Sequence, residues 1–319
     1  MNNVWGLIDD RTGHTGQVLG LISRLGLPYV LKRLDYNLLA RLPASLLGAN
    51  LFGVTGAHSQ HIAPPYPALV IAAGRRTLPV LRYIKRQSPG TKTMYLMWPE
   101  TRAGIDLIAV PEHDDAPADA QVVTTLGPLH AVTAETLSAA RGAWGAQFTH
   151  LPRPYIMLSL GGATSHGSYS AADWREIIQR SIKLAGHGSL LVTTSRRTPA
   201  EALAILEPLL QLPHILHRFD RDKDNPYLGF LACADGVVVT GDSLNMCAEA
   251  CVSGKPVYIY ASEKVAPPKH RRLHEALFVR GMARPFDYDA NLDWKPNAAL
   301  DDVEKVAREI KARFPQVFA

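Results

Sequence analysis

The sequence lacks several features that would assign the chain to a special class of protein. It has only three cysteines in 319 residues, an odd number in apolar surroundings, which excludes a disulfide framework and predicts buried, reduced thiols. Cys247 and Cys251 share one helical face, but no further ligands have metal-site spacing, so core packing is expected and no metal is predicted. No stretch approaches the roughly 18 consecutive apolar residues of a membrane-spanning helix. The apolar run before Asp9 and Asp10 is too short for a signal peptide, and we expect the chain in the cytoplasm.

The charge of the chain argues against nucleic acid as a partner. Lys and Arg number 34 against 29 Asp and Glu, a formal net charge of only +5. The basic residues form no long block, and a basic stripe with interleaved aromatic residues is missing. A small positive surplus better suits a phosphorylated small molecule or an anionic membrane surface.

Short apolar runs alternate with helix-length segments along the chain, a pattern typical of α/β domains with mostly parallel sheets. Two prolines in residues 151–154 directly precede a predicted strand at 155–160, which favours a linker there. We therefore predict an N-terminal domain over 1–151 and a C-terminal domain over 152–319, with the last helix, at 301–314, packing back on the N-terminal domain. Two Rossmann-like domains of this kind would face a central cleft.

A glycine-containing turn follows the first predicted strand and precedes the first predicted helix. Gly13 and Gly16 allow close approach of the backbone, and the helix N-terminus supplies free N–H groups for an anion or a hydroxyl. His14 and Asp10 would project there as possible acid or base groups. An ordinary strand-to-helix turn capped by Asp explains the same residues.

Two turns in the second half carry groups that suit a phosphate. Gly162 leads into Thr164 and Ser165 after a predicted strand, so backbone amides and hydroxyls could surround an anion, with a plain turn as the alternative. Arg196 follows the next strand and is placed to pair with a phosphate, whereas its neighbour Arg197 is expected to be a solvated loop residue.

The most informative motif is a turn that opens a short helix. Asp242 and Ser243 form the turn, and Glu249 lies inside the helix among small and apolar residues. A carboxylate in such surroundings needs a partner, because burying it alone is costly. A ribose diol and the side chain of Lys255 are the two candidates.

Residues 36–52 contain five leucines at helical spacing, with Arg41 among them and Lys32 and Arg33 just before. Such a helix could rest its apolar face on an anionic bilayer and present a lipid-linked acceptor. The alternative is a helix, interrupted at Pro43, that packs on its own domain, since a core also needs leucines. The leucines are Leu38, Leu39, Leu42, Leu46 and Leu47.

Several motifs together resemble a known family, the mitochondrial-fission "elongated mitochondria" family, which has many bacterial members. The family resembles GT-B glycosyltransferases. Residues 12–14 and the helix with Glu249 are also similar to the glycine-rich turn and the nucleotide-ribose helix of the peptidoglycan N-acetylglucosaminyltransferase. The motifs similar to the family lie at residues 161–165, 197–199, 225–232, 238–243, 249–258 and 280–286.

The resemblance implies a GT-B-like protein that binds a nucleoside-diphosphate sugar as donor substrate, needs no further cofactor and transfers the sugar to a cell-envelope acceptor at or near the inner membrane. His14 or Asp10 would be the base. Plant members are described as recruiters of a dynamin-like protein, so a non-catalytic adaptor with a dynamin-like or membrane partner is the alternative, and some bacterial members are called sugar-nucleotide epimerases. The implied donor-binding residues are Gly13, Gly162, Thr164, Ser165, Arg196, Asp242, Ser243 and Glu249.

Overall fold

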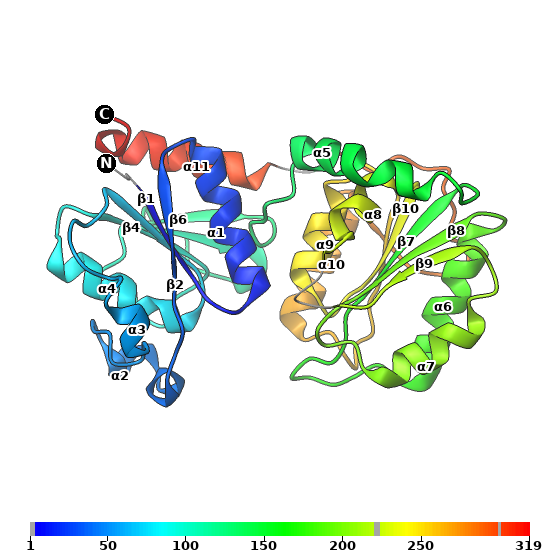
Figure 1. Cartoon of the computed structure of the whole chain (residues 1–319), viewed down its shortest axis with the longest axis horizontal. Coiled ribbons are helices and arrows are strands. Elements are labelled where there is room, and N and C mark those ends of the chain that lie inside the picture. The colour runs from blue at the N-terminus through cyan, green and yellow to red at the C-terminus, as the bar shows by residue number, and fades with distance from the viewer. Residues whose placement is uncertain (1–3, 220–223, 299–300) are drawn as a thin grey trace. The chain divides into compact units, whose positions relative to one another are not determined.

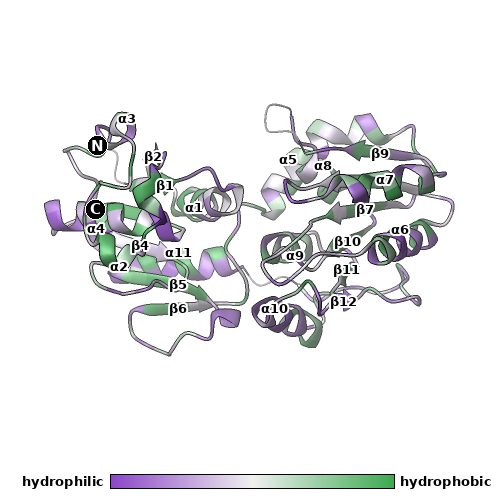
Figure 2. Ribbon diagram, turned by 90° about the horizontal axis from the view of Figure 1, so that it is seen from below, coloured by the Kyte–Doolittle hydropathy of each residue, from purple (hydrophilic) through white to green (hydrophobic). Residues whose placement is uncertain are grey.

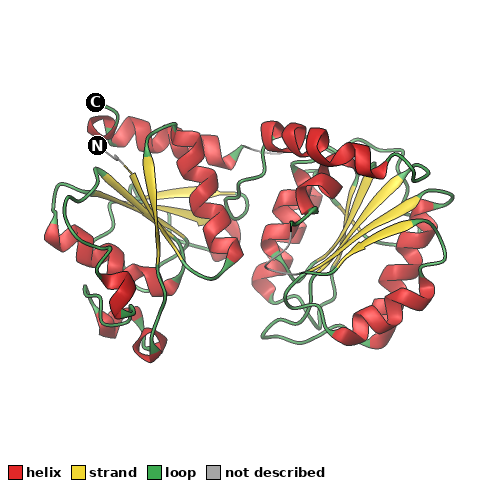
Figure 3. Cartoon of the chain, in the orientation of Figure 1, coloured by secondary structure: helices red, strands yellow, loops and turns green. Residues whose placement is uncertain are grey.

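A computed structural model describes residues 4–219, 224–298 and 301–319. The chain divides into two compact units: unit 1 comprises residues 1–131 and 301–319, and unit 2 comprises residues 132–300 (Figure 1). Each unit is built on one six-stranded sheet in which every strand pairing is parallel, with helices packed on the sheet (Figure 3). The predicted α/β class with two Rossmann-like domains is confirmed.

Unit 1 has the strand order β2-β1-β3-β4-β5-β6. Its central strands are continuous apolar runs, as a sheet covered on both faces requires, and β5 is mostly green in Figure 2. The strands are β1 (Val4–Ile8), β2 (Tyr29–Arg33), β3 (Leu69–Ala72), β4 (Lys92–Leu96), β5 (Leu107–Pro111) and β6 (Val122–Thr125). The helices are α1 (Thr12–Leu25), α2 (Ala44–Leu47), α3 (Gly56–Ser59), α4 (Leu78–Gln87) and α11 (Asp302–Arg313), with 3-10 turns at Leu38–Arg41, Arg75–Thr77, Glu112–Asp114 and Pro315–Val317.

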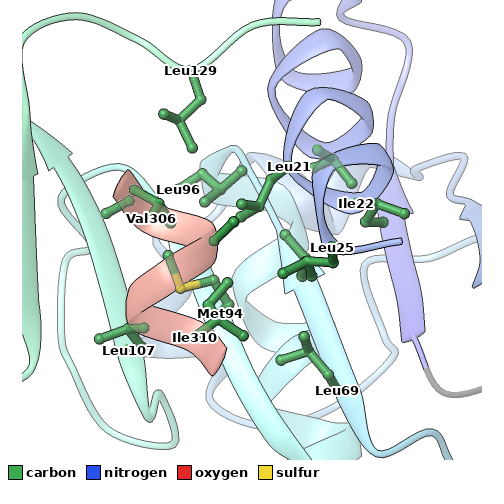
Figure 4. Close-up of a cluster of buried hydrophobic side chains, with 14 of the residues drawn as sticks. Leu21, Ile22, Leu25, Leu69, Met94, Leu96, Leu107, Leu129, Val306 and Ile310 are labelled. Atoms are coloured by element: carbon green, nitrogen blue, oxygen red, sulfur yellow. The ribbon is translucent and has the colours of Figure 1, made fainter. Parts of the chain in front are cut away.

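The last helix, α11, completes the core of unit 1. Its buried face, with Val306 and Ile310, lies in the same apolar cluster as Leu21 of α1 and Met94 of β4 (Figure 4). Amphipathic spacing explains this face, because its apolar positions recur every three or four residues. The carboxylate of Asp302 at its start accepts a hydrogen bond of 2.7 Å from the Leu126 N–H.

Unit 2 has the order β12-β11-β10-β7-β8-β9. Numbered along the chain within this unit, the order reads 3-2-1-4-5-6, the Rossmann order, with its switch point between β7 and β10. The strands are β7 (Tyr155–Leu160), β8 (Ser189–Thr194), β9 (His214–His217), β10 (Gly236–Thr240), β11 (Val257–Tyr260) and β12 (Arg284–Pro285). The helices are α5 (Ala134–Trp144), α6 (Ala171–Ala185), α7 (Ala200–Leu209), α8 (Tyr227–Cys233), α9 (Leu244–Cys251) and α10 (Pro268–Val279), with a 3-10 turn at Gly145–Phe148.

The division between the units lies before α5, about twenty residues earlier than the predicted boundary at Leu151. Helix α5 packs closely on α8. A side-chain carbon added at Gly229 of α8 would lie only 2.5 Å from the ring of Trp144 in α5. Phe148 packs its ring against that of Phe230 at 5.5 Å. Residues 132–151 therefore belong to unit 2, and the proline-rich segment is a turn inside that unit rather than a linker.

The leucine-rich segment between β2 and β3 does not form the single expected helix. A 3-10 turn and α2 flank Pro43, and the side chains of Leu38 and Leu46 are 72% and 74% exposed. Of the two alternatives for these leucines, packing in the core is wrong for Leu38, Leu39, Leu42 and Leu46, which are exposed. Alanines pack against the core instead: Ala40 is the buried residue of the 3-10 turn, and Ala44 is the buried residue of α2.

All three cysteines are free and buried, as predicted. Among the described residues, no helix is long and apolar enough to cross a bilayer.

Candidate functional site

Seven of the ten predicted site residues lie in unit 2: six on the loops that follow β7, β8 and β10, and Glu249 inside α9. These loops leave the carboxyl ends of parallel strands at the switch point, where open α/β sheets usually bind ligands. The remaining three, Asp10, Gly13 and His14, follow β1 in unit 1. There the strand order reverses between β1 and β3, so both groups occupy the corresponding place in their own sheets.

A buried carboxylate organises the glycine turn after β7. Asp242, 1% exposed, accepts a hydrogen bond of 2.9 Å from the Gly162 N–H and forms an ion pair of 2.7 Å with Arg197. Gly161 must be glycine, because a side-chain carbon there would lie 2.1 Å from the Asp242 carboxylate. Burial raises the pKa of Asp242, while the charge of Arg197 and the Gly162 N–H oppose that rise. Both contacts are made by the Oδ2 atom, whereas Oδ1 is buried without a hydrogen-bond partner among the described residues.

Arg197 is an exposed loop residue, as the sequence suggested, but it is also held by the ion pair with Asp242 and by donating to the Ala163 carbonyl at 2.9 Å. Its neighbour Arg196 is exposed. Thr198 strengthens the same connection, since its hydroxyl lies 2.8 and 2.7 Å from the carbonyls of Leu160 and Gly161. The loop after β8 is therefore fastened to the loop after β7 on both sides of Gly162.

The two hydroxyl residues of the glycine turn differ in their availability. The Thr164 hydroxyl donates to the Val265 carbonyl at 2.6 Å and accepts from the His166 N–H at 3.0 Å. Its single proton is therefore committed. Ser165, by contrast, is exposed. Ser243 caps α9 by accepting from the Met246 N–H at 3.4 Å.

Glu249 has a partner that the sequence analysis did not consider. The Tyr227 hydroxyl, from α8, donates to its carboxylate at 2.8 Å, and no ion pair joins Glu249 to Lys255 in the described part of the chain. Burial raises the pKa of Glu249 to about 7, although the hydrogen bond from Tyr227 opposes the rise. The carboxylate therefore has a low cost of protonation near neutral pH and a single strong donor, which leaves acceptor capacity for a ligand hydroxyl.

In unit 1, His14 lies on the first turn of α1 against the loop after β3. Its Nδ1 is 3.4 Å from a carboxylate oxygen of Asp9, whose side chain is 1% exposed. Gly74, with φ of +91°, allows this approach, because a side-chain carbon there would lie 2.4 Å from Nδ1. A buried carboxylate that faces one ring nitrogen orients the imidazole and leaves the other nitrogen for chemistry. A separation longer than a hydrogen bond is common for catalytic groups without ligand.

Asp10 is held differently from His14. Arg76, after β3, forms an ion pair with Asp10 and another, of 3.0 Å, with Asp9. Partial burial opposes ionisation of Asp10, but the hydrogen bond and charge of Arg76 outweigh it and keep the pKa of this carboxyl below its usual value. Asp10 is thus a weaker base than an unpaired carboxylate, and the geometry favours His14. Sequence reasoning missed Arg76, although its place just after a buried strand was a usable signal.

A cavity of about 360 Å³ lies at the amino ends of the unit 2 strands, opposite their carboxyl ends. Arg141 and Arg153 line it, but Arg141 donates to the Ala232 carbonyl and Arg153 pairs with Asp235 at 2.6 Å. Its cations are therefore already engaged in holding α8 and the start of β10, and the cavity is not a strong candidate site.

Comparison with known proteins assigns the chain to a family. The model of the family described as "Mitochondrial fission ELM1" matches residues 12–314. The chain belongs to the mitochondrial fission ELM1 family. The mitochondrial fission protein ELM1 of Arabidopsis thaliana is 28% identical over 300 residues, which cover 85% of this chain and 70% of that protein. The protein RP120 of Rickettsia prowazekii is 28% identical over 352 residues, covering 97% of this chain and 98% of that protein.

Solved structures similar to this ELM1-family chain show the GT-B fold. Os79 of O. sativa, in complex with U2F and trichothecene, has a TM-score of 0.54 at 14% identity, covering 98% of this chain and 94% of Os79. MnaA of S. aureus with UDP has a TM-score of 0.54 at 12% identity, covering 99% and 90%. The UDP-GlcNAc 2-epimerase of Neisseria meningitidis bound to UDP-GlcNAc has a TM-score of 0.52 at 12% identity, covering 98% and 92%. The predicted GT-B-like architecture and family resemblance are both confirmed.

The two neighbouring arginines of this ELM1-family chain should differ in their effect on stability. Arg197→Met leaves the buried carboxylate of Asp242 without its counter-charge and should lower the free energy of unfolding by about 1–3 kcal/mol. Arg196→Met, at the exposed neighbour, should change it by less than about 0.5 kcal/mol. Urea denaturation measures both, and adding Asp242→Asn to Arg197→Met should restore most of the loss. Equal effects of the two single substitutions would contradict the ion pair.

Glu249→Gln should change how stability depends on pH. Since the folded-state pKa of Glu249 is raised from 4.5 to about 7, the wild type loses stability as pH rises through that range, and the glutamine variant does not. The variant should therefore gain up to about 3 kcal/mol over the wild type between pH 4.5 and pH 8. Denaturation curves at the two pH values measure this, with the exposed Glu263→Gln as control. If the difference in unfolding free energy between the variant and the wild type were the same at pH 4.5 and pH 8, the environment of Glu249 would not disfavour its charged form.

Proposed function

We propose that the protein binds a nucleoside-diphosphate sugar in unit 2 and transfers the sugar to a cell-envelope acceptor. One observation carries the proposal: at the Rossmann switch point of unit 2, a fastened glycine turn and the half-buried carboxylate of Glu249 lie on loops and a helix that follow the carboxyl ends of β7 and β10. The UDP and UDP-GlcNAc present in the similarly folded MnaA and epimerase structures support it.

The proposed donor contacts follow from which groups are still available. Ser165 and the exposed Arg196 can meet the diphosphate, while Gly162 and Thr164 shape the turn. The N-terminus of α9, capped by Ser243, favours negative charge. The Glu249 carboxylate would accept hydrogen bonds from the ribose hydroxyls, with the Tyr227 hydroxyl holding the carboxylate in place. The remaining predicted contacts are Gly13, in the first turn of α1, and Asp242, which acts by fixing Gly162 and Arg197.

The proposed base is His14, oriented by Asp9. In this mechanism the imidazole takes the proton of the acceptor hydroxyl as its oxygen attacks the sugar carbon and the nucleoside diphosphate leaves with the bonding electrons. Asp9 offsets the positive charge that then develops on the ring. Asp10 remains the second candidate, but Arg76 already neutralises it.

The proposed acceptor is lipid-linked and reached at the inner-membrane face. A non-catalytic adaptor that recruits a dynamin-like or membrane partner is the second candidate, favoured by the exposed leucines between β2 and β3. Nucleotide binding separates the two functions, because an adaptor needs neither a diphosphate site nor a base. A thermal-shift panel of sugar nucleotides would identify the donor, since a ligand that binds the folded state stabilises it.

Glu249→Ala should weaken binding of UDP, or of the sugar nucleotide that the thermal-shift panel selects, by about 1–3 kcal/mol. The reason is the loss of a charge-assisted hydrogen-bond partner of the ribose. Titration calorimetry measures the change, with Glu263→Gln as a control at an exposed carboxylate. Equal affinity of wild type and Glu249→Ala would remove Glu249 from the donor site.

His14→Ala should spare donor binding and abolish most of the turnover. Its loss should lower transfer of a radiolabelled sugar from the bound nucleotide to an envelope lipid extract by roughly 100-fold or more, the usual range for a general base. Calorimetry on the same variant should give the wild-type affinity for nucleotide, because the His14 imidazole is not among the proposed donor contacts. Full transfer activity of this variant would return the turn after β1 to a structural role.

A further inference from the structure

The segment between β2 and β3 concentrates the exposed apolar side chains of the molecule. Eight large apolar residues are strongly exposed in the described ranges, and five of them fall within residues 38–52. We call these five the β2–β3 patch: Leu38, Leu39, Leu42, Leu46 and Phe52. Singly exposed apolar residues are ordinary, but a concentration of this kind marks an interaction surface.

The backbone of the patch is folded tightly rather than left open. The Asn37 side chain accepts from the Leu39 N–H at 2.9 Å and donates to the Phe52 carbonyl at 2.7 Å, which joins the two ends of the patch. Arg75 donates to the Leu42 carbonyl at 2.6 Å and to the carbonyl of Ala40. The carbonyls of Phe52, Leu42 and Ala40 are therefore bonded inside the protein, as a segment entering the apolar edge of a bilayer needs.

Small residues anchor the patch while large residues point outward. Ala40, Ala44 and Val54 are buried, and the last two belong to the same core cluster as Tyr95 of β4. A core helix would show the reverse arrangement, with leucine inside and small residues outside. The exposed leucines are therefore not the loose outer side of a core helix, and replacing them should leave the fold intact.

The charges around the patch are mainly positive. Arg33, Arg41 and Arg75 are exposed beside it, and Lys32 is half-buried over the ring of Trp5. Two carboxylates oppose them, and both already have partners. Asp35 faces His58 at 3.3 Å and Arg33 at 3.9 Å, and Glu100 accepts from the Ser45 N–H at 3.1 Å. The neighbourhood keeps a net positive charge, which complements an anionic surface.

We propose that the β2–β3 patch inserts into the interface of an anionic phospholipid bilayer and holds the protein there peripherally. Leucine and phenylalanine enter the boundary between headgroups and acyl chains, while Arg33 and Arg41 contact the phosphates. A protein partner is less well matched, because protein-binding hot spots are rich in Trp, Tyr and Arg and poor in Leu. The proposal rests on the proposed function in one respect: a lipid-linked acceptor requires the protein to reach a membrane.

Vesicle co-sedimentation of the full chain tests the proposal. Because the assay contains no nucleotide, a failure to bind vesicles is distinct from a failure of the proposed transferase function. The wild type should pellet with vesicles of phosphatidylglycerol and phosphatidylcholine at low salt and be released by salt. Leu38→Asp with Leu46→Asp should lower the vesicle-bound partition coefficient by about tenfold or more. Arg33→Gln and Arg41→Gln should each lower it by about fivefold.

Val279→Asp is the control, to be compared with Leu38→Asp alone, because it also adds one aspartate at a strongly exposed apolar residue, 81% exposed and outside the patch, and should bind like the wild type. Circular dichroism melting checks that the leucine variant stays folded, and if it does not, Leu38→Ser with Leu46→Ser replaces it. Wild type that stays in the supernatant with anionic vesicles, or leucine and control variants that bind alike, would overturn the proposal. The proposal would also be overturned if the wild type formed a dimer in solution, the leucine variant did not, and both bound vesicles equally. The patch would then face a second copy of the chain.

Discussion

The buried carboxylate of Asp242 is the constraint on which the proposed donor site depends. It ties the turn after β7 to the loop after β8, through the Gly162 N–H and Arg197, at the point where the strand order of unit 2 reverses. Removing a carboxylate from water is costly unless it is paired and hydrogen-bonded, so the turn and the arginine hold each other in place. The groups still available to a ligand, Ser165 and Arg196, extend from this fixed base.

Unit 1 uses the same device with different residues. Asp9, after β1, is buried and pairs with Arg76, which comes from the loop after β3. Both switch points are thus built on a buried aspartate and an arginine from another strand's loop. Each aspartate accepts a hydrogen bond from a backbone N–H, that of Gly162 in unit 2 and that of Arg11 in unit 1, and Asp9 also faces the imidazole of His14. In the proposed function, unit 2 shapes the donor site and unit 1 supplies the base.

The sequence predicted the α/β class and most of the strands because parallel strands buried on both faces are continuous apolar runs. It misplaced the division between the units, since prolines near 152 look like a linker when the packing of α5 on α8 is unknown. The partners of charged residues were also missed: Arg197 for Asp242, Tyr227 for Glu249 and Arg76 for Asp10. Each pair joins residues more than twenty positions apart, which spacing along one sequence cannot reveal. Leucine spacing in 36–52 indicated an apolar face, but exposure depends on which neighbours cover it.

Hydrogen–deuterium exchange with and without saturating UDP-sugar tests the central claim, that unit 2 binds a nucleotide at its switch point. The account predicts slower exchange in peptides covering 161–167 and 241–251, with little change in 36–52. Exchange that is unchanged in both of those regions, or protected only elsewhere in the chain, would contradict it.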